Sequence, residues 1–432
     1  MLVCTGTGGA MLKLAQHPSI RCISADREVG ARLDVTTTTV GASVAWDGGV
    51  GGAGVTVAVL DSGIALHPDL LKPEKRLIGW VDLVNRRSSP YDDNGHGTHV
   101  AGIIAGSGAV ARERRLRERL QGVAPRARLV GLKVLDAQGR GLASTVIEGI
   151  DWCIRNKGRF ELRVLNLSLG TPVRESFRTD PLCLACEKAT AAGLLVVTPA
   201  GNRGRSVADD PNSPTVYGTI DCPGNDPLVL TVGATKTLGT FAIGDDGIAS
   251  FSSRGPSLID FVVKPDLVAP GNRVVSLDAR SGGYREMSGT SMAAPVAAGA
   301  AALLFSRDPK LSPHDVKARL MKTALKVWHA DGTSPDVFSR GAGYLNIPAA
   351  LACADRVQRP ARSPQLAPTG TLAPLGSSTA LWGDTALWGD TSLWGDAALW
   401  GDAALWGDAA LWGDTALWGD TALWGDAALW GD

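Results

Sequence analysis

The sequence lacks positive charge in its C-terminal part. No Lys or Arg follows Arg362, whereas nine Asp do. Residues 1–362 therefore carry 43 basic and 34 acidic residues, a net charge of +9, and the remainder carries −9. Aromatic residues make up only 6% of the chain, and none are interleaved with the basic residues as nucleic-acid binding requires. This distribution predicts no nucleic-acid partner.

Cysteine is scarce and odd in number. Seven residues leave at least one thiol unpaired, and their spacings match no disulfide framework. Cys183 and Cys186 form a Cys-x-x-Cys pair, which redox enzymes and zinc sites use. A second Cys pair for zinc and a thioredoxin-like context are missing, so we interpret the cysteines as structural thiols and predict no cofactor. The seven are Cys4, Cys22, Cys153, Cys183, Cys186, Cys222 and Cys353.

Long apolar runs are also rare. Residues 1–12 lack a basic region and are interrupted by Gly-Thr-Gly-Gly, so no secretory signal is recognised there. The longest uncharged run, residues 287–306, approaches the length of a membrane span. Because it opens with small polar residues and a proline, it predicts a buried core helix. We expect no membrane span.

The apolar segments that are present predict an α/β fold. Apolar content of 44% suits a globular protein with a sizeable core. Short apolar runs rich in β-branched residues alternate with helical patterns such as residues 144–156 and 181–192, which indicates a parallel sheet flanked by helices. Functional groups of such sheets collect at the carboxyl ends of the strands. The expected strands are residues 55–60, 128–134, 164–169, 194–198 and 228–232.

The C-terminal segment has a short period. After a Pro-, Ser-, Thr-, Gly- and Ala-rich linker at residues 356–378, residues 379–432 comprise nine hexapeptides of the form (T/A)-(A/S)-Leu-Trp-Gly-Asp. A fixed period suggests solenoid-like coils with Leu inward, whereas Gly-Asp in every repeat favours disorder, and both interpretations stay open. Upstream, residues 112–120 (RERRLRERL) predict a solvated helical insertion with i, i+4 ion pairs, or a partner-binding patch.

Three polar residues stand in settings suited to nucleophilic catalysis. Asp61 ends a predicted strand, His96 lies in Asn-Gly-His-Gly-Thr-His, and Ser291 opens the predicted core helix. Acyl transfer needs a hydroxyl, an imidazole that takes its proton and a carboxylate that orients the imidazole. The order Asp, His, Ser is one of those known for this geometry. His96 and His99 could also be metal ligands, but two ligands do not complete a site.

An oxyanion needs donors as well. The helix that begins near Ser291 offers a free backbone N–H and a positive dipole end, and Pro295 is expected in its first turn. Asn202, which follows a predicted strand between Gly201 and Gly204, is the candidate for a second donor.

Together these motifs resemble the subtilisin-like serine protease family (peptidase S8, subtilase). The resemblance rests on VAVLDSGI, HGTHVAGIIAG, GVAP, LNLSLGTP, AGN and GTSMAAPVAAG, which follow one another in this order between residues 55 and 351. It implies a subtilisin-like parallel α/β sheet and hydrolysis of protein or peptide substrates. Carried over by motif, Asp61 orients, His96 is the base, Ser291 attacks and Asn202 donates to the oxyanion. His99 is then a hydrogen-bonded core histidine of the same helix.

The resemblance also implies where a substrate lies. The backbone of Ser168, Leu169 and Gly170 borders the P1 pocket, and Leu132, Lys133 and Val134 pair with the substrate as a strand edge. Alignment of Pro223-Gly224 with the Pro-Gly of the family pocket places Asp221 at the pocket floor. There it attracts a P1 Lys or Arg, caps a turn, or is neutralised by Arg203.

Domain organisation and location follow the same resemblance. Residues 1–30 resemble the end of an inhibitory propeptide, residues 31–355 form the peptidase domain, and the linker and repeats follow. We expect a monomer outside the cell. The family's calcium site at Asp69 is in doubt because RERRLRERL stands where its second loop belongs, so no metal is predicted.

Two alternative functions belong to other classes of protein. A catalytically silent scaffold would display the repeats for adhesion, although the four site residues are intact. An esterase would also use Ser291, but the Gly-x-Ser-x-Gly elbow is missing because residue 293 is Ala.

Overall fold

The computed structural model describes His17 and residues 33–114, 120–206, 213–326, 335–366 and 372–373. Contacts divide the chain into a unit of Met1–Ala31, of which only His17 is described, and a unit of Arg32–Asp432. The predicted propeptide segment, the nine repeats and part of the linker therefore lie outside the described residues.

The core of the second unit is one parallel sheet. Its strand order is β10-β8-β6-β4-β1-β3-β2, and each neighbouring pair on this path is parallel, which confirms the predicted α/β architecture. A short strand, β9, extends β8 in the antiparallel direction. The strands are β1 (Thr56–Asp61), β2 (Leu77–Asp82), β3 (Arg128–Lys133), β4 (Leu162–Asn166), β6 (Leu195–Pro199), β8 (Leu230–Lys236), β9 (Gly247–Ile248) and β10 (Leu267–Pro270).

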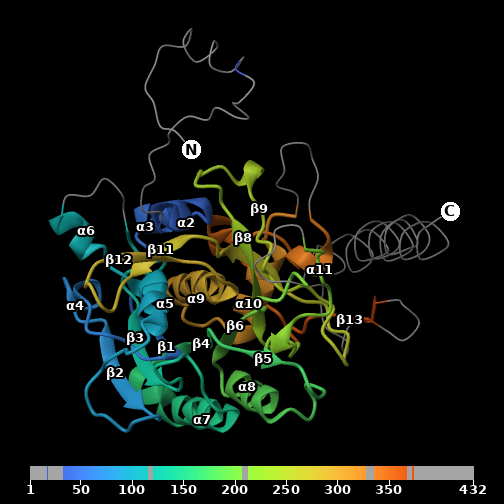
Figure 1. Ribbon diagram of the computed structural model, residues 1–432, viewed down its shortest axis with the longest axis horizontal. Coiled ribbons are helices and arrows are strands. Elements are labelled where there is room, and N and C mark those ends of the chain that lie inside the picture. The colour runs from blue at the N-terminus through green and yellow to red at the C-terminus, as the bar shows by residue number, and fades with distance from the viewer. Residues whose placement is uncertain are drawn as a thin grey trace. The chain divides into compact units, whose positions relative to one another are not determined.

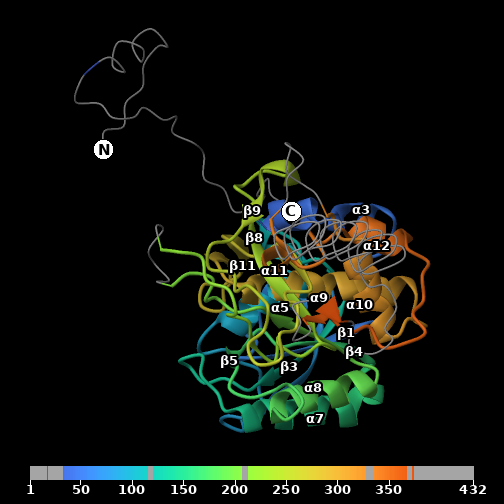
Figure 2. The same ribbon diagram turned by 90° about the vertical axis from the view of Figure 1, so that its right-hand side faces the viewer.

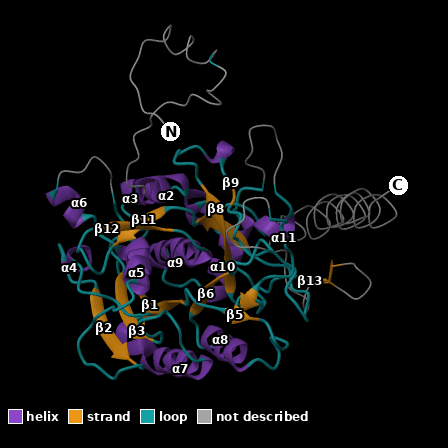
Figure 3. Ribbon diagram, in the orientation of Figure 1, coloured by secondary structure: helices purple, strands orange, loops and turns teal. Residues whose placement is uncertain are grey.

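Helices cover both faces of the sheet (Figures 1 and 3). α5 (His96–Ala105) and α9 (Thr290–Arg307) lie together on one face, and α7 (Ala143–Phe160) and α8 (Pro181–Ala191) lie on the other, as the turned view in Figure 2 also shows. Their apolar residues pack against continuous runs of buried strand residues such as Val57–Leu60. Burial on both faces explains why these strands read as uninterrupted apolar runs.

The uncharged run at residues 287–306 is almost entirely α9. Residues from Met292 to Phe305 are buried, so the predicted core helix is confirmed. Within the described ranges, no helix is both long and apolar enough to cross a membrane.

Shorter elements complete this unit. Beside the cleft, β5 and β7 pair in the antiparallel direction. α6 ends at Glu113, whose exposed carboxylate lies 2.8 Å from the Lys72 ammonium group, and residues 115–119 of the predicted insertion lie outside the described part. The remaining elements are α2 (Leu33–Thr39), α3 (Ala42–Asp47), α4 (Pro68–Leu71), β5 (Thr171–Pro172), β7 (Asp221–Cys222), η1 (Ile243–Asp245), β11 (Val274–Leu277), β12 (Tyr284–Met287), α6 (Ala109–Glu113), α10 (Pro313–Lys322), α11 (Val337–Arg340), α12 (Ile347–Ala352), β13 (Gln365–Leu366) and β14 (Leu372–Ala373).

Candidate active site

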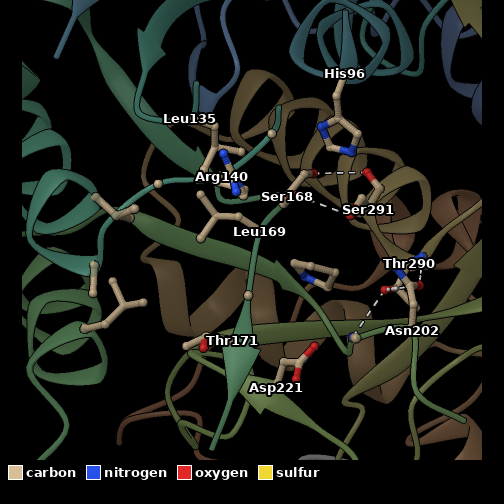
Figure 4. Close-up of a pocket in the computed structure, with 18 of the residues that line it drawn as sticks. His96, Leu135, Arg140, Ser168, Leu169, Thr171, Asn202, Asp221, Thr290 and Ser291 are labelled. Atoms are coloured by element: carbon tan, nitrogen blue, oxygen red, sulfur yellow. Dashed lines mark hydrogen bonds between the residues drawn. The ribbon is translucent and has the colours of Figure 1, made fainter. Parts of the chain in front are cut away.

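A cleft of about 670 Å³ lies where the parallel strands end, and Figure 4 shows its lining. Its walls come from segments that follow β3, β4 and β6, from β7 and from the first turn of α9. This is the sheet edge at which the sequence predicts functional groups. Of the predicted site residues, the lining includes His96, Ser168, Leu169, Gly170, Asn202, Asp221 and Ser291.

Asp61 and His96 form the central contact of the site. Asp61 is the last residue of β1 and its side chain is fully buried, while His96 is the first residue of α5 and its side chain is 21% exposed. Asp61 Oδ1 and His96 Nδ1 are 2.7 Å apart, and the same oxygen accepts a bond from the Ser62 backbone N–H. The carboxylate therefore fixes the orientation of the imidazole and leaves Nε2 free to exchange a proton with a ligand.

The environment of His96 favours the protonated ring. Burial lowers the pKa of His96, but the negative charge of Asp61 and its hydrogen bond outweigh that effect and raise the pKa above 6.5. A base with a raised pKa accepts a proton more readily when the pH keeps it neutral.

Ser291 lies in the first turn of α9 and lines the same cleft as His96 (Figure 4). Its hydroxyl donates to the backbone carbonyl of Ser168 at 3.2 Å. In return, the Ser168 hydroxyl donates to the backbone carbonyl of Ser291 at 3.0 Å. The two serines thus hold the start of α9 against the segment that follows β4.

The second of these bonds explains the position of Pro295, which differs from the prediction. Because α9 begins at Thr290, Pro295 falls in the second turn rather than the first. A proline has no N–H, so the carbonyl of Ser291, four residues earlier, has no partner within the helix. The Ser168 hydroxyl takes the place of that missing donor.

Asn202 is oriented by a residue that the sequence analysis missed. Asn202 Oδ1 accepts bonds from the backbone N–H of Thr290 at 2.9 Å and from its hydroxyl at 3.0 Å. With its oxygen engaged, the Asn202 side chain presents Nδ2 as a donor beside the α9 N-terminus. Thr290 immediately precedes Ser291 in the sequence, which is the signal that could have identified it.

Two glycines permit the close approach of the backbone to the site. A Cβ on Gly97 would lie 2.2 Å from the Gly63 carbonyl oxygen and 3.0 Å from the Asp61 Cβ. A Cβ on Gly201 would lie 2.5 Å from Asp221 Oδ2, and its φ of +109° also favours glycine. Any side chain at either position would displace a site carboxylate or the loop that carries it.

His99 is the core histidine that the sequence predicts. It is fully buried in α5, and its Nε2 lies 3.1 Å from the Arg285 carbonyl oxygen. Burial lowers the pKa of His99 to about 3, so the ring is neutral. His99 is therefore a structural residue.

The predicted substrate-pairing strand is wrong. Leu132 and Lys133 belong to β3, which pairs with β1 on one side and β2 on the other, so it has no free edge. Leu132, Lys133 and Val134 are fully buried, and the Lys133 ammonium group donates to Ser62 O and Asp93 Oδ1. The cleft is lined instead by the following loop, residues 138–142, in which Gly139 and Gly141 flank Arg140. This glycine-rich turn directly after a strand is a signal that the sequence analysis did not use.

Asp221 lines the cleft from β7, but its charge is paired. The Arg203 guanidinium group donates to Asp221 Oδ1 and to the Thr219 carbonyl oxygen. The Asp221 side chain is 14% exposed and that of Arg203 is 43% exposed. Burial raises the pKa of Asp221, and the neighbouring Arg203 opposes that rise. Of the three predicted roles, the structure favours neutralisation by Arg203.

The carboxylate of Asp69 is engaged by protein donors. Asp69 Oδ1 accepts from the Val110 N–H at 2.8 Å, and Oδ2 accepts from the Gly108 N–H at 3.1 Å and the Tyr284 hydroxyl at 2.7 Å. These contacts tie the start of α6 to α4. Both carboxylate oxygens therefore accept hydrogen bonds that hold these segments together.

Comparison with known proteins defines the class of this chain, which is a hydrolase of the subtilisin-like serine protease type. A model of the subtilase family matches residues 52–346. Serine protease AprX from Bacillus subtilis (strain 168) is 40% identical over 353 residues, which cover 77% of this chain and 74% of AprX. Subtilisin DY from Bacillus licheniformis is 36% identical over 303 residues, which cover 70% of this chain and 92% of that protein.

Solved structures show the same similarity. An S41 psychrophilic protease superimposes with a TM-score of 0.56 at 32% identity, over 68% of this chain and 92% of that one. A cold-adapted subtilisin-like serine proteinase gives a TM-score of 0.52 at 29% identity, over 76% and 93%. The chain belongs to the subtilase family.

Proposed function

We propose that this subtilase is a serine endopeptidase in which Ser291 is the nucleophile, His96 the general base and Asp61 the residue that orients His96. The observation that carries the proposal is the 2.7 Å contact between Asp61 Oδ1 and His96 Nδ1, with His96 and Ser291 in one cleft. Nucleophile, base and orienting carboxylate are the three parts that acyl transfer requires.

Catalysis begins with a change of partner at Ser291. Its hydroxyl leaves the Ser168 carbonyl, turns to His96 Nε2 and transfers its proton there while Oγ attacks the substrate carbonyl carbon. The charge of Asp61 stabilises the imidazolium that forms. His96 then protonates the leaving amine, and a water molecule releases the acyl group by the same steps.

The developing oxyanion is stabilised by two donors. Asn202 contributes Nδ2, because its Oδ1 is held by Thr290. Ser291 contributes its own N–H, which as the second residue of α9 has no acceptor within the helix. The α9 dipole adds a favourable potential at the same point.

A peptide substrate lies between the two cleft loops. Ser168, Leu169 and Gly170 border it on one side, and Gly139, Arg140 and Gly141 border it on the other. Because Arg203 neutralises Asp221, the pocket floor does not by itself select a P1 Lys or Arg. The extracellular location, the monomeric state and the propeptide stay predictions.

Digestion of casein tests the proposal. The wild-type protein is expected to digest casein and to react with a fluorophosphonate, whereas a Ser291→Ala variant that folds normally does neither. Reaction with the probe without casein digestion would instead indicate an esterase. The absence of both would indicate a catalytically silent scaffold.

A further inference from the structure

Two thiols from distant parts of the sequence meet beside the cleft. Cys183 lies in the first turn of α8, and Cys222 is the last residue of β7. Their Sγ atoms are 3.7 Å apart, and both side chains are buried. The sequence suggests Cys183 and Cys186 as the possible pair, but the fold brings Cys183 to Cys222 instead.

Two side-chain oxygen atoms that could act as metal ligands lie beside the thiols. One carboxylate oxygen of Asp180 and the Sγ atoms of Cys183 and Cys222 all lie within 4.8 Å of one another. Asn225 Oδ1 is 3.5 Å from Cys183 Sγ. Asn225 is fully buried, and its Nδ2 has no hydrogen-bond partner within the described ranges. A buried amide with an unsatisfied nitrogen thus directs its oxygen to the Cys183 sulfur atom.

We propose that Asp180, Cys183, Cys222 and Asn225 bind one thiophilic divalent cation, and that Zn2+ fits this group best. Two thiolates and a carboxylate are ligands that suit zinc, and the Asn225 amide oxygen supplies a neutral fourth ligand. Asp180 Oδ1 already caps α8 through the N–H groups of Leu182 and Cys183, which leaves Oδ2 for the cation.

Two of the separations between the proposed ligands agree with tetrahedral coordination. With zinc–sulfur bonds of about 2.3 Å, two sulfur ligands of a tetrahedral site lie about 3.8 Å apart, and a sulfur and an oxygen ligand lie about 3.6 Å apart. The corresponding separations are 3.7 Å between the Sγ atoms and 3.5 Å between Cys183 Sγ and Asn225 Oδ1. A disulfide between the same two residues would instead bring the sulfur atoms from 3.7 Å to about 2.05 Å.

The four proposed ligands lie in two short segments of the chain, each of which forms one arm of the site. Asp180-x-x-Cys183 is the N-cap and first turn of α8, and Cys222-x-x-Asn225 is the turn that follows β7. The second turn is closed by a bond from the Asn225 N–H to the Asp221 carbonyl at 3.1 Å. Two residues between the ligands of each arm is a spacing that structural zinc sites use. The segment Cys222-Pro-Gly-Asn225 thus takes the place of the second Cys-x-x-Cys pair that the sequence lacks.

Binding of the cation changes no oxidation state and releases protons. Each thiol loses one proton to solvent and forms one sulfur–zinc bond, so two protons leave for each cation bound. Without the cation, the two thiols form a neutral pair in which one S–H faces the other sulfur.

The cation would join α8 to a wall of the cleft. Cys222 is opposite Thr171 in the β5–β7 pair, and Thr171 and Asp221 both line the cleft. A structural site here stabilises that wall without entering the reaction. This inference does not depend on the proposed catalytic residues.

Metal analysis of the full chain tests the site. The protein is purified as Ser291→Ala, to prevent self-digestion, in reducing buffer with added Zn2+, and is then freed of unbound metal. We expect one zinc per chain. Replacement of zinc by Co2+ is expected to give the charge-transfer absorption of a thiolate–cobalt bond. Cys183→Ser and Cys222→Ser should each lose the zinc and this absorption.

A matched control distinguishes the loss of a zinc ligand from the loss of any buried thiol. Cys153→Ser changes another fully buried thiol, in α7, and should keep one zinc per chain. Zinc that both Cys183→Ser and Cys222→Ser retain would overturn the proposal, and so would a zinc-free wild type. A Cys183–Cys222 disulfide, seen by mass spectrometry under non-reducing conditions in chains isolated without reductant, would also overturn it. The cobalt spectrum of the Ser291→Ala chain tests the thiolate ligands even if a cysteine variant does not fold.

Discussion

The hydroxyl of Ser168 donates to the carbonyl oxygen of Ser291 at 3.0 Å, where the helix itself can supply no donor because Pro295 lies four residues further on. The bond therefore couples the segment after β4 to the helix that carries the proposed nucleophile. Ser168 is buried, so removal of its hydroxyl leaves a carbonyl without a partner.

Ser168→Ala is expected to lower the free energy of unfolding by about 1–3 kcal/mol, the cost of an unsatisfied buried acceptor. Pro295→Ala supplies an N–H within α9, so adding it to Ser168→Ala should recover part of this loss. Urea unfolding in a Ser291→Ala background measures both effects. If Pro295→Ala shifts stability equally with and without Ser168, the two residues are not coupled through this carbonyl.

The pH dependence of catalysis should reflect the raised pKa of His96. Because the base must be neutral, kcat/KM is expected to rise with pH through a value above the ordinary 6.5 of an imidazole. Asp61→Asn removes the charge that raises this pKa, and it should lower kcat by about 10⁴-fold, the loss known for the equivalent change in a Ser-His-Asp triad. An unchanged pH profile in that variant would mean that Asp61 does not act on His96.

The same contact affects stability in a defined pH window. A folded-state pKa above the unfolded value means that the folded protein holds the His96 proton more tightly. The stabilisation from Asp61 and His96 is therefore fully present below about pH 6.5 and is lost as the pH rises through the raised pKa. Melting temperatures of Ser291→Ala chains with and without Asp61→Asn should differ most in acid and converge at alkaline pH.

Asn202 and Thr290 should affect catalysis unequally. Asn202→Ala is expected to lower kcat by about 10²–10³-fold, the magnitude known for the equivalent residue of subtilisin. Thr290→Val keeps the backbone N–H that holds Asn202 but removes the hydroxyl, so a smaller loss in kcat is expected. Steady-state kinetics on a small peptide measure both, and an Asn202→Ala enzyme with wild-type kcat would refute the oxyanion assignment.

The Arg203–Asp221 pair predicts how P1 preference can be changed. Arg203→Gln leaves the Asp221 carboxylate unpaired in the cleft, so kcat/KM for peptides with P1 Lys or Arg should rise several-fold relative to P1 Leu or Phe. Adding Asp221→Asn to Arg203→Gln is the matched control and should abolish the gain. If Arg203→Gln alone leaves the ratio unchanged, Asp221 does not contact the P1 side chain.

The sequence predicts five strands of the central sheet and the residues proposed to act in its cleft because both depend on local patterns. Buried parallel strands read as apolar runs, and Asp61, His96, Ser291 and Asn202 each stand at a strand or helix end where such a sheet presents its functional groups. These four positions needed no knowledge of how distant segments pair.

The features that the sequence did not predict depend on such pairing. Whether Leu132 lies on an edge strand or inside the sheet is decided by β2, which covers β3 and precedes it in sequence. Cys183 meets Cys222 rather than Cys186 because β7 pairs with β5 beside α8, a contact between residues 39 positions apart. The spacing of residues along the sequence does not indicate contacts between such distant segments.

Mapping of a covalent fluorophosphonate adduct tests the central claim most directly. The intact chain is treated with the probe, digested and analysed by mass spectrometry, beside His96→Ala and His99→Ala as a matched pair of histidine changes on α5. If Ser291 and His96 act as proposed, the wild type is modified at Ser291 alone, and His96→Ala loses this reaction. His99→Ala, provided that it folds, keeps it. Modification of a different serine, or an undiminished rate at Ser291 in His96→Ala, would contradict the account.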